Sequence, residues 1–301
     1  MENKAALEAG MLYLVPTPIG NLEDMTVRAV RVLKEADLIA AEDTRNSLKL
    51  LTHFDIHTPM VSYHEYNKYD RARELTEKML SGQTVAVITD AGTPGISDPG
   101  EELVRCAAQA GIRVSALPGA CAGITALVMS GLPTRRFDFE GFLPQKKKER
   151  KEALERLKEI CATIILYEAP HHLKDTLEDL ETALGDRKLA VVRELTKIHE
   201  EVLRMTIREA REYYKTVEPR GEYVLVLDGA DEEERKKEQQ QRWEKKPLSE
   251  HVGLYMEQGM DRKQAMKAAA ADRGLTRREV YQRLLEEEEK TGEESSDHEG
   301  E

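Results

Sequence analysis

The chain has 301 residues, a length typical of two ordinary domains with room for a small appended module. Hydrophobic residues make up 40% and charged residues 34%, which is the profile of an ordinary soluble enzyme. The first residues lack the basic start and apolar run of a signal peptide, and no stretch approaches the ~18 apolar residues that a membrane helix needs. We therefore expect a cytoplasmic protein that does not enter a membrane.

The net charge of −12 is concentrated near the C-terminus. Residues 286–301 contain nine acidic residues and one lysine, a net charge of −8, so the rest of the chain carries only −4. Basic clusters remain visible in that larger part. Net charge therefore does not exclude an RNA partner, and the local distribution of charge has to decide.

No metal site is expected. The cysteines are odd in number, far apart and free of CxxC spacing, which indicates reduced residues that bind no zinc: Cys106, Cys121 and Cys161. Metal-ligand spacing is also absent around His171 and His172.

Residues 1–125 alternate strand-length apolar runs with helical patterns, which predicts a mostly parallel sheet covered by helices. Strands are expected at 11–15, 38–41, 84–89 and 113–117, and helices at 26–36, 72–80 and 101–110. Residues 126–230 predict a second α/β domain with a mixed sheet, because their β signals are less regularly spaced. These signals lie at 163–167, 190–193, 201–205 and 223–227. The fold class is therefore α/β, with two α/β domains and a cleft between them, a common place for a ligand.

The last third of the chain is more polar. Residues 231–247 are interpreted as a charged linker, in part helical, and residues 248–290 as a compact helical module. The acidic residues 291–301 are expected to be disordered.

Two capping patterns organise the helical module. Asp261 is suited to begin a helix that Gly274 ends, and Thr276 with Glu279 forms a T-x-x-E capping box for the next helix. Three short helices with a tight turn before the last resemble a helix-turn-helix. The alternative is a small helical bundle for dimer contacts or packing.

The most informative segment is a loop rich in Gly and Pro, Asp90 to Gly100, directly after a predicted strand. Such loops bring backbone close to a ligand, and ligands bind at the carboxyl ends of strands in open α/β sheets. Prolines occupy positions where the P-loop and the dinucleotide-binding loop need amide donors, so neither motif is matched. Similar loops lie at 15–22 and 117–123, each directly after a predicted strand. The three loops predict a ligand-lined rim on one edge of the sheet.

Several motifs then occur in a fixed order along the chain. They are VPTPIGNLEDMT (15–26), AAEDTRNSLKLL (40–51), SYHEYN (62–67), DAGTPGISDPG (90–100), LPGACAG (117–123), LYEAPHHL (166–173), RELTKIHEEVLR (193–204) and RGEY (220–223). Over roughly residues 11–290 the chain resembles the tetrapyrrole (corrin/porphyrin) methylase superfamily, and within it the branch that methylates ribosomal RNA. Porphyrin methylases have a glycine-rich first loop ending in a DPELLT-like run. PIGNLEDMT stands in its place here, which argues against a tetrapyrrole substrate.

This resemblance implies that S-adenosyl-L-methionine binds in the cleft between the two α/β domains. Backbone groups and small residues would hold the adenine and methionine parts, while nearby carboxylates favour the sulfonium cation. The implied contacts are Pro18, Asp90, Gly92, Thr93, Ile96, Ser97, Cys121, Ala122, Tyr167, Glu168, Ala169, Gly221 and Glu222.

The implied reaction is methyl transfer to the ribose 2′-oxygen of a decoding-centre cytidine in 16S rRNA of the 30S subunit, by a homodimer. A 2′-hydroxyl is a weak nucleophile, so it has to be aligned with the S–CH₃ bond and relieved of its proton. The candidate base or orienting residues are Glu168, Glu194, Asp98 and Asp43. For each one, a structural salt bridge is the alternative.

Basic side chains near the rim are candidates for RNA contacts. Arg45 follows a strand and is expected to point toward the rim, and residues 145–151 are interpreted as a basic loop, although such a run is often only a solvated surface. His64 is a weaker candidate, since an isolated histidine is usually structural. The remaining candidates are Lys146, Lys147, Lys148, Arg193 and Lys197, with Lys263, Arg277 and Arg278 in the helical module.

Two other functions stay open. A precorrin or porphyrin C-methyltransferase would keep the fold and change the substrate. A metabolite-sensing regulator would read DNA with the helix-turn-helix, but its last helix ends in four glutamates (286–289), which argues against it. A nicotinamide-dependent dehydrogenase is excluded because the glycine fingerprint and the ribose-binding acidic residue are missing.

Overall fold

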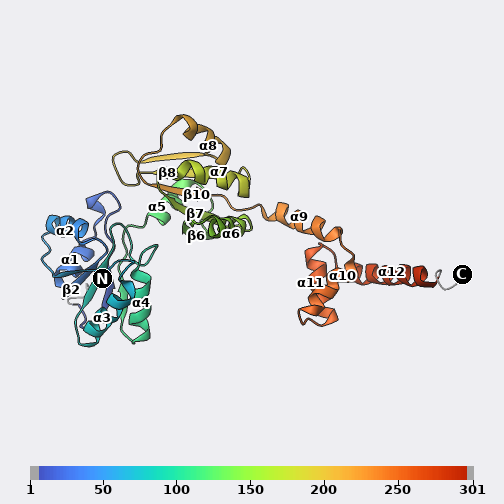
Figure 1. Ribbon diagram of the computed structural model, residues 1–301, viewed down its shortest axis with the longest axis horizontal. Coiled ribbons are helices and arrows are strands. Elements are labelled where there is room, and N and C mark those ends of the chain that lie inside the picture. The colour runs from blue at the N-terminus through green and yellow to red at the C-terminus, as the bar shows by residue number, and fades with distance from the viewer. Residues whose placement is uncertain (1–6, 297–301) are drawn as a thin grey trace. The chain divides into compact units, whose positions relative to one another are not determined.

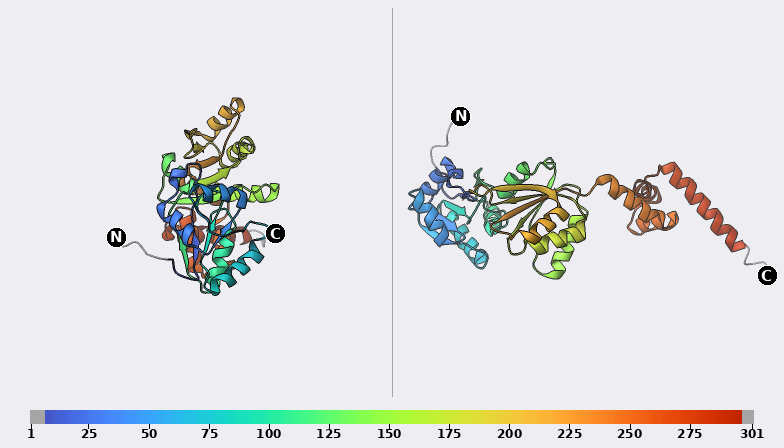
Figure 2. Two further views of the ribbon diagram at one scale, coloured as in Figure 1. Left: turned by 90° about the vertical axis from the view of Figure 1, so that its left-hand side faces the viewer. Right: turned by 90° about the horizontal axis from the view of Figure 1, so that it is seen from above.

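The computed structural model describes residues 7–296, apart from the side chains at 234–236, 238, 239, 242 and 288–296. The chain forms two compact units, Met1–Gly229 and Ala230–Glu301. In Figures 1 and 2 the first unit runs from blue to gold and the second is orange to red. No helix of the described residues is long and apolar enough to cross a membrane.

The first unit begins with a parallel five-stranded sheet in the order β3-β2-β4-β1-β5. Its strands are β1 (Leu12–Leu14), β2 (Leu38–Ala41), β3 (Met60–Ser62), β4 (Val85–Ile88) and β5 (Val114–Ala116). The four predicted strands and the parallel sheet are confirmed. Strand β3 was not predicted.

Helices cover both faces of this sheet, so its central strands are apolar on both sides. Tyr13 and Val15 pack toward α1 (Val27–Glu35) and α2 (Thr44–His53), while Leu12 and Leu14 pack toward α3 and α4. The other helical elements here are η1 (Leu22–Asp24), α3 (Lys68–Leu80) and α4 (Gly100–Gln109). The expected helices at 26–36, 72–80 and 101–110 are confirmed, and α2 was not predicted.

A second five-stranded sheet follows in the order β6-β7-β10-β8-β9. Only the β6–β7 pair is parallel, so the prediction of a mixed sheet is confirmed. Its strands are β6 (Phe137–Phe142), β7 (Thr163–Glu168), β8 (Lys188–Arg193), β9 (Glu201–Thr206) and β10 (Tyr223–Leu227).

Four helices pack on this second sheet. Helix α5 (Ala122–Ser130) covers one face through Ala126 and Leu127, and the predicted domain boundary between residues 125 and 126 falls inside it. The other face is covered by α6 (Lys147–Lys158), α7 (Leu173–Leu184) and α8 (Ile207–Thr216).

The interpretation of residues 145–151 as a loop was wrong, because α6 begins at Lys147. Lysine, arginine and glutamate are good helix formers, so a charged run can be the first turn of a helix whose buried residues come later. In α6 these buried residues are Ala153, Leu154 and Leu157.

The second unit is helical. It consists of α9 (Glu232–Glu244), α10 (Leu248–Glu257), α11 (Arg262–Asp272) and α12 (Arg277–Ser296). The helical part of the predicted linker is α9, whose Trp243 ring stacks on His251 of α10 at 3.5 Å. Of the tail expected to be disordered, residues 291–296 belong to α12, and 297–301 lie outside the described residues.

Both predicted caps in this unit are confirmed. The Asp261 side chain accepts from the Gln264 amide at 2.8 Å, and Thr276 and Glu279 exchange hydrogen bonds at the start of α12. Gly274, with φ +63°, ends α11 in the left-handed region. The tight turn before α12 therefore contains the predicted glycine and the predicted capping residues.

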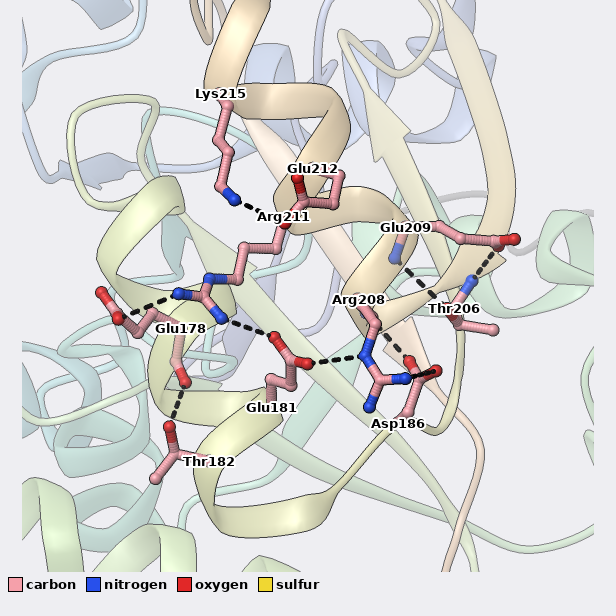
Figure 3. Close-up of polar contacts among 10 residues, drawn as sticks. All are labelled: Glu178, Glu181, Thr182, Asp186, Thr206, Arg208, Glu209, Arg211, Glu212 and Lys215. Atoms are coloured by element: carbon pink, nitrogen blue, oxygen red, sulfur yellow. Dashed lines mark hydrogen bonds and ion pairs between the residues drawn. The ribbon is translucent and has the colours of Figure 1, made fainter.

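On the outer face of the second sheet, charged side chains tie α7 to α8 (Figure 3). Glu181 accepts from Arg208 Nε and Arg211 Nη1, each at 2.9 Å, so one carboxylate bridges two guanidinium groups. Arg211 also contacts Glu178 at 3.2 Å. The hydrogen bonds from Arg211 and Arg208 lower the pKa of Glu181 below its ordinary value.

We predict that Glu181→Gln lowers the thermal midpoint at pH 7, because both guanidinium groups lose their shared carboxylate. The folded pKa lies below the unfolded value of 4.5, so the stabilisation is complete above pH 4.5 and is lost as pH falls through the folded pKa. Melting curves of variant and wild type should therefore converge in acid. The control, Glu212→Gln, removes one exposed ion pair with Lys215 and should have little effect. Equal midpoint changes in the two variants would contradict this account.

Candidate active site

Three loops meet at the carboxyl edge of the first sheet, as the sequence predicted. They follow the adjacent strands β4, β1 and β5. Thr17 and Gly92 exchange two backbone hydrogen bonds of 3.0 Å, which join the first loop to the second. Thr93 Oγ1 donates to the Ala120 carbonyl at 2.8 Å, which joins the second loop to the third. Hydrogen bonds therefore hold the three loops of the rim together.

A carboxylate shapes the second loop from within. Asp98 accepts hydrogen bonds from the backbone amides of Gly95 (2.8 Å), Ile96 (3.0 Å) and Gly100 (2.8 Å). Ser97 takes a positive φ of 64°, a conformation that a non-glycine residue adopts only when its surroundings enforce it. The oxygens of Asp98 are thus used to fold the loop.

The second sheet supplies the opposite wall. The Tyr167 hydroxyl accepts from the Gly123 amide at the start of α5 at 3.0 Å, and burial raises the pKa of Tyr167. A register shift in β6 between Phe139 and Gly141 turns Phe142 toward the Tyr167 ring, 5.6 Å between centroids. Gly141 has φ +71°, so a side chain there would strain this bulge.

Between these walls lies a cavity of about 440 Å³. Its charged lining residues are four carboxylates, Glu42, Asp98, Glu168 and Glu222, and no lysine, arginine or histidine is among the described residues that line it. The remaining lining is small or apolar, apart from Tyr167 and Tyr223. The cavity therefore favours a ligand that combines an apolar body with positive charge.

Most of the predicted cofactor residues line this cavity. The lining members are Gly92, Thr93, Ile96, Ser97, Cys121, Ala122, Tyr167, Glu168, Ala169 and Glu222. Pro18, Asp90 and Gly221 lie in the same loops, next to lining residues in the chain. The lining residues outside the predicted set are Ile19, Glu42, Thr89, Ala91, Phe142, Pro170, Val192, Leu195, Tyr223 and Val224.

Two of the predicted bases, Glu168 and Glu194, have local partners. Glu168 is 6% exposed and accepts from the Ala169 amide at 2.8 Å and from Thr176 Oγ1 at 2.5 Å. Burial raises the pKa of Glu194, but the hydrogen bonds from Lys197 and the Glu222 amide outweigh it, and the pKa is lowered.

Asp43 begins α2 and pairs with Arg45. The Arg45 side chain donates to both Asp43 oxygens, at 3.2 and 2.9 Å, and these hydrogen bonds lower the pKa of Asp43 to about 2. Arg45 is largely exposed and does not line the cavity. Asp43 holds the Arg45 side chain, and the role of Arg45 at the rim stays a prediction.

Glu42 is the lining residue of most chemical interest outside the predicted set. Glu42 directly follows β2, and Asp90 lies two residues after the end of β4. A position at the carboxyl end of a strand is the sequence signal that could have identified Glu42 as a site residue. Burial raises the pKa of Glu42, with further contributions from the charges of Asp90, Asp98 and Asp43.

A family model described as Tetrapyrrole (Corrin/Porphyrin) Methylases matches residues 11–211. The chain belongs to this family. Two similar proteins are Ribosomal RNA small subunit methyltransferase I of Halalkalibacterium halodurans and of Bacillus subtilis, each 50% identical over 274 residues, covering 91% of this chain and 94% of each relative. The Synechocystis protein of the same name is 50% identical over 278 residues, covering 92% of this chain and 98% of its own length.

Solved structures share the fold. A diphthine synthase has a TM-score of 0.56 at 16% identity and covers 72% of this chain and 90% of its own. A Thermus thermophilus uroporphyrin-III C-methyltransferase complexed with S-adenyl homocysteine has a TM-score of 0.51 at 22% identity, covering 72% and 97%. The predicted α/β fold of two domains with C-terminal helices is confirmed, and the chain is a methyltransferase of the tetrapyrrole methylase family.

Apart from Arg45, the basic residues predicted to contact RNA lie in three places. Lys146 and Lys148 are exposed at the start of α6 and face Glu149 and Glu152, and Lys147 is exposed beside them. Arg193 pairs with Glu201 at 3.1 Å, while Lys197 contacts Glu194 and Glu222. In the second unit, Lys263, Arg277 and Arg278 line one open groove with Arg262, Met266, Tyr281 and Leu285.

We predict that Gly119→Ala weakens binding of S-adenosylmethionine roughly 10–100-fold, because a Cβ at this position would lie 2.5 Å from Pro16 Cβ and push the first and third loops apart. Isothermal titration calorimetry measures the effect. Gly253→Ala is the control, since an added Cβ there meets no atom within 4 Å. Unchanged affinity of Gly119→Ala in a folded protein would show that the loop contact does not shape the binding site.

Proposed function

We propose that this methylase transfers the methyl group of S-adenosyl-L-methionine to the ribose 2′-hydroxyl of a decoding-centre cytidine in 16S rRNA, within the 30S subunit. The observation that carries the choice of donor is the cavity, whose charged lining groups are all carboxylates. The rRNA substrate is supported by relatives at 50% identity that are named for small-subunit rRNA methylation.

The cavity fits the methyl donor. Its volume of about 440 Å³ lies within the range of sites for small ligands. Gly92, Ala122 and Ala169 leave room for the adenosine against backbone, and the carboxylates complement the sulfonium and ammonium charges. S-adenosylmethionine supplies an electrophilic methyl group, and the protein's task is to align the hydroxyl with it. The residues proposed to hold the donor are Pro18, Asp90, Gly92, Thr93, Ile96, Ser97, Cys121, Ala122, Tyr167, Glu168, Ala169, Gly221 and Glu222.

Alignment is the main physical contribution. Holding the hydroxyl and the methyl carbon in a reactive geometry is worth up to ~7–11 kcal/mol. The connected loops are suited to this, since backbone hydrogen bonds join Thr17 to Gly92, and the Thr93 hydroxyl donates to the Ala120 carbonyl. Removal of the hydroxyl proton by a positioned base adds about 10²–10⁴-fold.

The rRNA backbone requires positive charge outside the acidic cavity. Lys146, Lys147 and Lys148 at the start of α6 are exposed and suited to phosphates. The groove of the second unit combines guanidinium groups with the Tyr281 ring, which is 54% exposed, so it offers both charge and a stacking surface. Arg45, Arg193 and Lys197 are further RNA contacts in this proposal, through N–H donors that their acidic partners leave free. The working form is a homodimer in the cytoplasm, where the 30S subunit is found.

Transfer of labelled methyl from S-adenosylmethionine to 30S subunits that lack the modification tests this proposal. We expect label in 2′-O-methylcytidine after digestion to nucleosides. Label in another nucleoside, or none when donor binding is intact, would contradict it. In that case uroporphyrinogen and precorrins are the next acceptors, because they keep the fold and change only the substrate. Methylation of a tetrapyrrole carbon would establish the alternative.

A further inference from the structure

The proposed reaction leaves one proton without an assigned acceptor. The four carboxylates predicted for this role already accept hydrogen bonds from other groups. Asp98 accepts from three loop amides, and Asp43 accepts from Arg45. Glu168 accepts from the Ala169 amide and Thr176, and Glu194 accepts from Lys197 and the Glu222 amide. Their lone pairs hold loops and helix ends in place. For Asp43 and Glu194 these bonds also lower the pKa, since each bond favours the ionised form.

Glu42 differs from these four. It lines the cavity, is half-buried, and accepts one long hydrogen bond among the described residues, from the Asp90 amide at 3.5 Å. No described cation contacts it. Its carboxylate therefore keeps free lone pairs inside the cavity in which the methyl donor binds.

The surroundings of Glu42 also strengthen it as a base. Burial disfavours its ionised form and raises its pKa, and neighbouring negative charges act in the same direction, while the Asp90 amide opposes them. A base with a raised pKa accepts a proton more readily near neutral pH. The charged groups around it are Asp90 and Asp98 from the loop after β4, Asp43 with its partner Arg45 at the start of α2, and Glu168 and Glu222 across the cavity.

We propose that Glu42 is the general base that takes the proton of the attacking 2′-hydroxyl. In this step the 2′-oxygen forms a bond to the methyl carbon, and the S–C bond breaks with its electron pair left on sulfur. The O–H bond breaks, and its proton moves to a Glu42 carboxylate oxygen, from which solvent removes it. The products are the 2′-O-methyl ribose and S-adenosylhomocysteine. The assignment rests on the proposed function, because it concerns the proton of a hydroxyl acceptor.

Glu42→Gln tests this role, because it keeps the shape and removes the basic oxygen. Single-turnover methylation of 30S subunits should fall about 10²–10⁴-fold, while calorimetry should show donor affinity within a few-fold of wild type. Asp70→Asn, an acid-to-amide change at an exposed residue of α3, is the control and should leave the rate unchanged. A loss of less than about tenfold in Glu42→Gln, with donor affinity intact, would overturn the assignment.

The pH profile separates a base from a structural residue. In wild type the rate should rise with pH along a limb whose apparent pKa lies above the 4.5 of an ordinary glutamate, and Glu42→Gln should lose this limb. Asp90→Asn removes a negative charge beside Glu42 but keeps the backbone amide, so the limb should move to lower pH. An unmoved limb in both variants would assign the titration to another group and overturn the proposal.

Failure of the wider function gives a different result. If wild-type protein methylates a base nitrogen or a tetrapyrrole carbon, the proposed function falls, and the role of Glu42 falls with it. If wild type forms 2′-O-methylcytidine and the loss appears in Asp43→Asn or Asp98→Asn while Glu42→Gln stays active, only the assignment of the base is wrong.

Discussion

The paired backbone hydrogen bonds between Thr17 and Gly92 are the constraint on which the site depends. They exist because β1 and β4 are adjacent and parallel, so that their following loops leave the sheet at the same edge. With Thr93 bound to the Ala120 carbonyl, they turn three flexible-looking loops into one wall. Asp98 completes this wall by accepting hydrogen bonds from three amides of its own loop.

A second consequence is electrostatic. Backbone groups and uncharged side chains form most of the cavity wall, so the charge of the cavity comes from a few side chains, all of them acidic among the described residues. Basic side chains lie outside it, at the start of α6 and in the groove of the helical unit. The chain thus separates a site for a cation from surfaces suited to phosphate, which explains how an acidic protein is compatible with an RNA substrate.

The sequence predicted the fold well in segments where the apolar residues follow one clear period, that of a strand or that of a helix. Strands 38–41 and 223–227 have the predicted bounds, and Gly and Pro in the loops located the rim. Helix α6 was missed because its first turn is charged on every side, and β6 because the Gly141 bulge interrupts its alternation. The sequence does not show that Asp98 holds its own loop together while Glu42 keeps free oxygens in the cavity. Both features depend on which amides and carboxylates the fold brings within reach.

We infer that the cavity between the two sheets of the first unit binds the methyl donor. A crystal structure of the protein with S-adenosylmethionine tests it most directly. We expect ligand density in this cavity, touching residues of all three loops and of β7. Density in the groove of α11 and α12, or an empty cavity at saturating ligand, would contradict it.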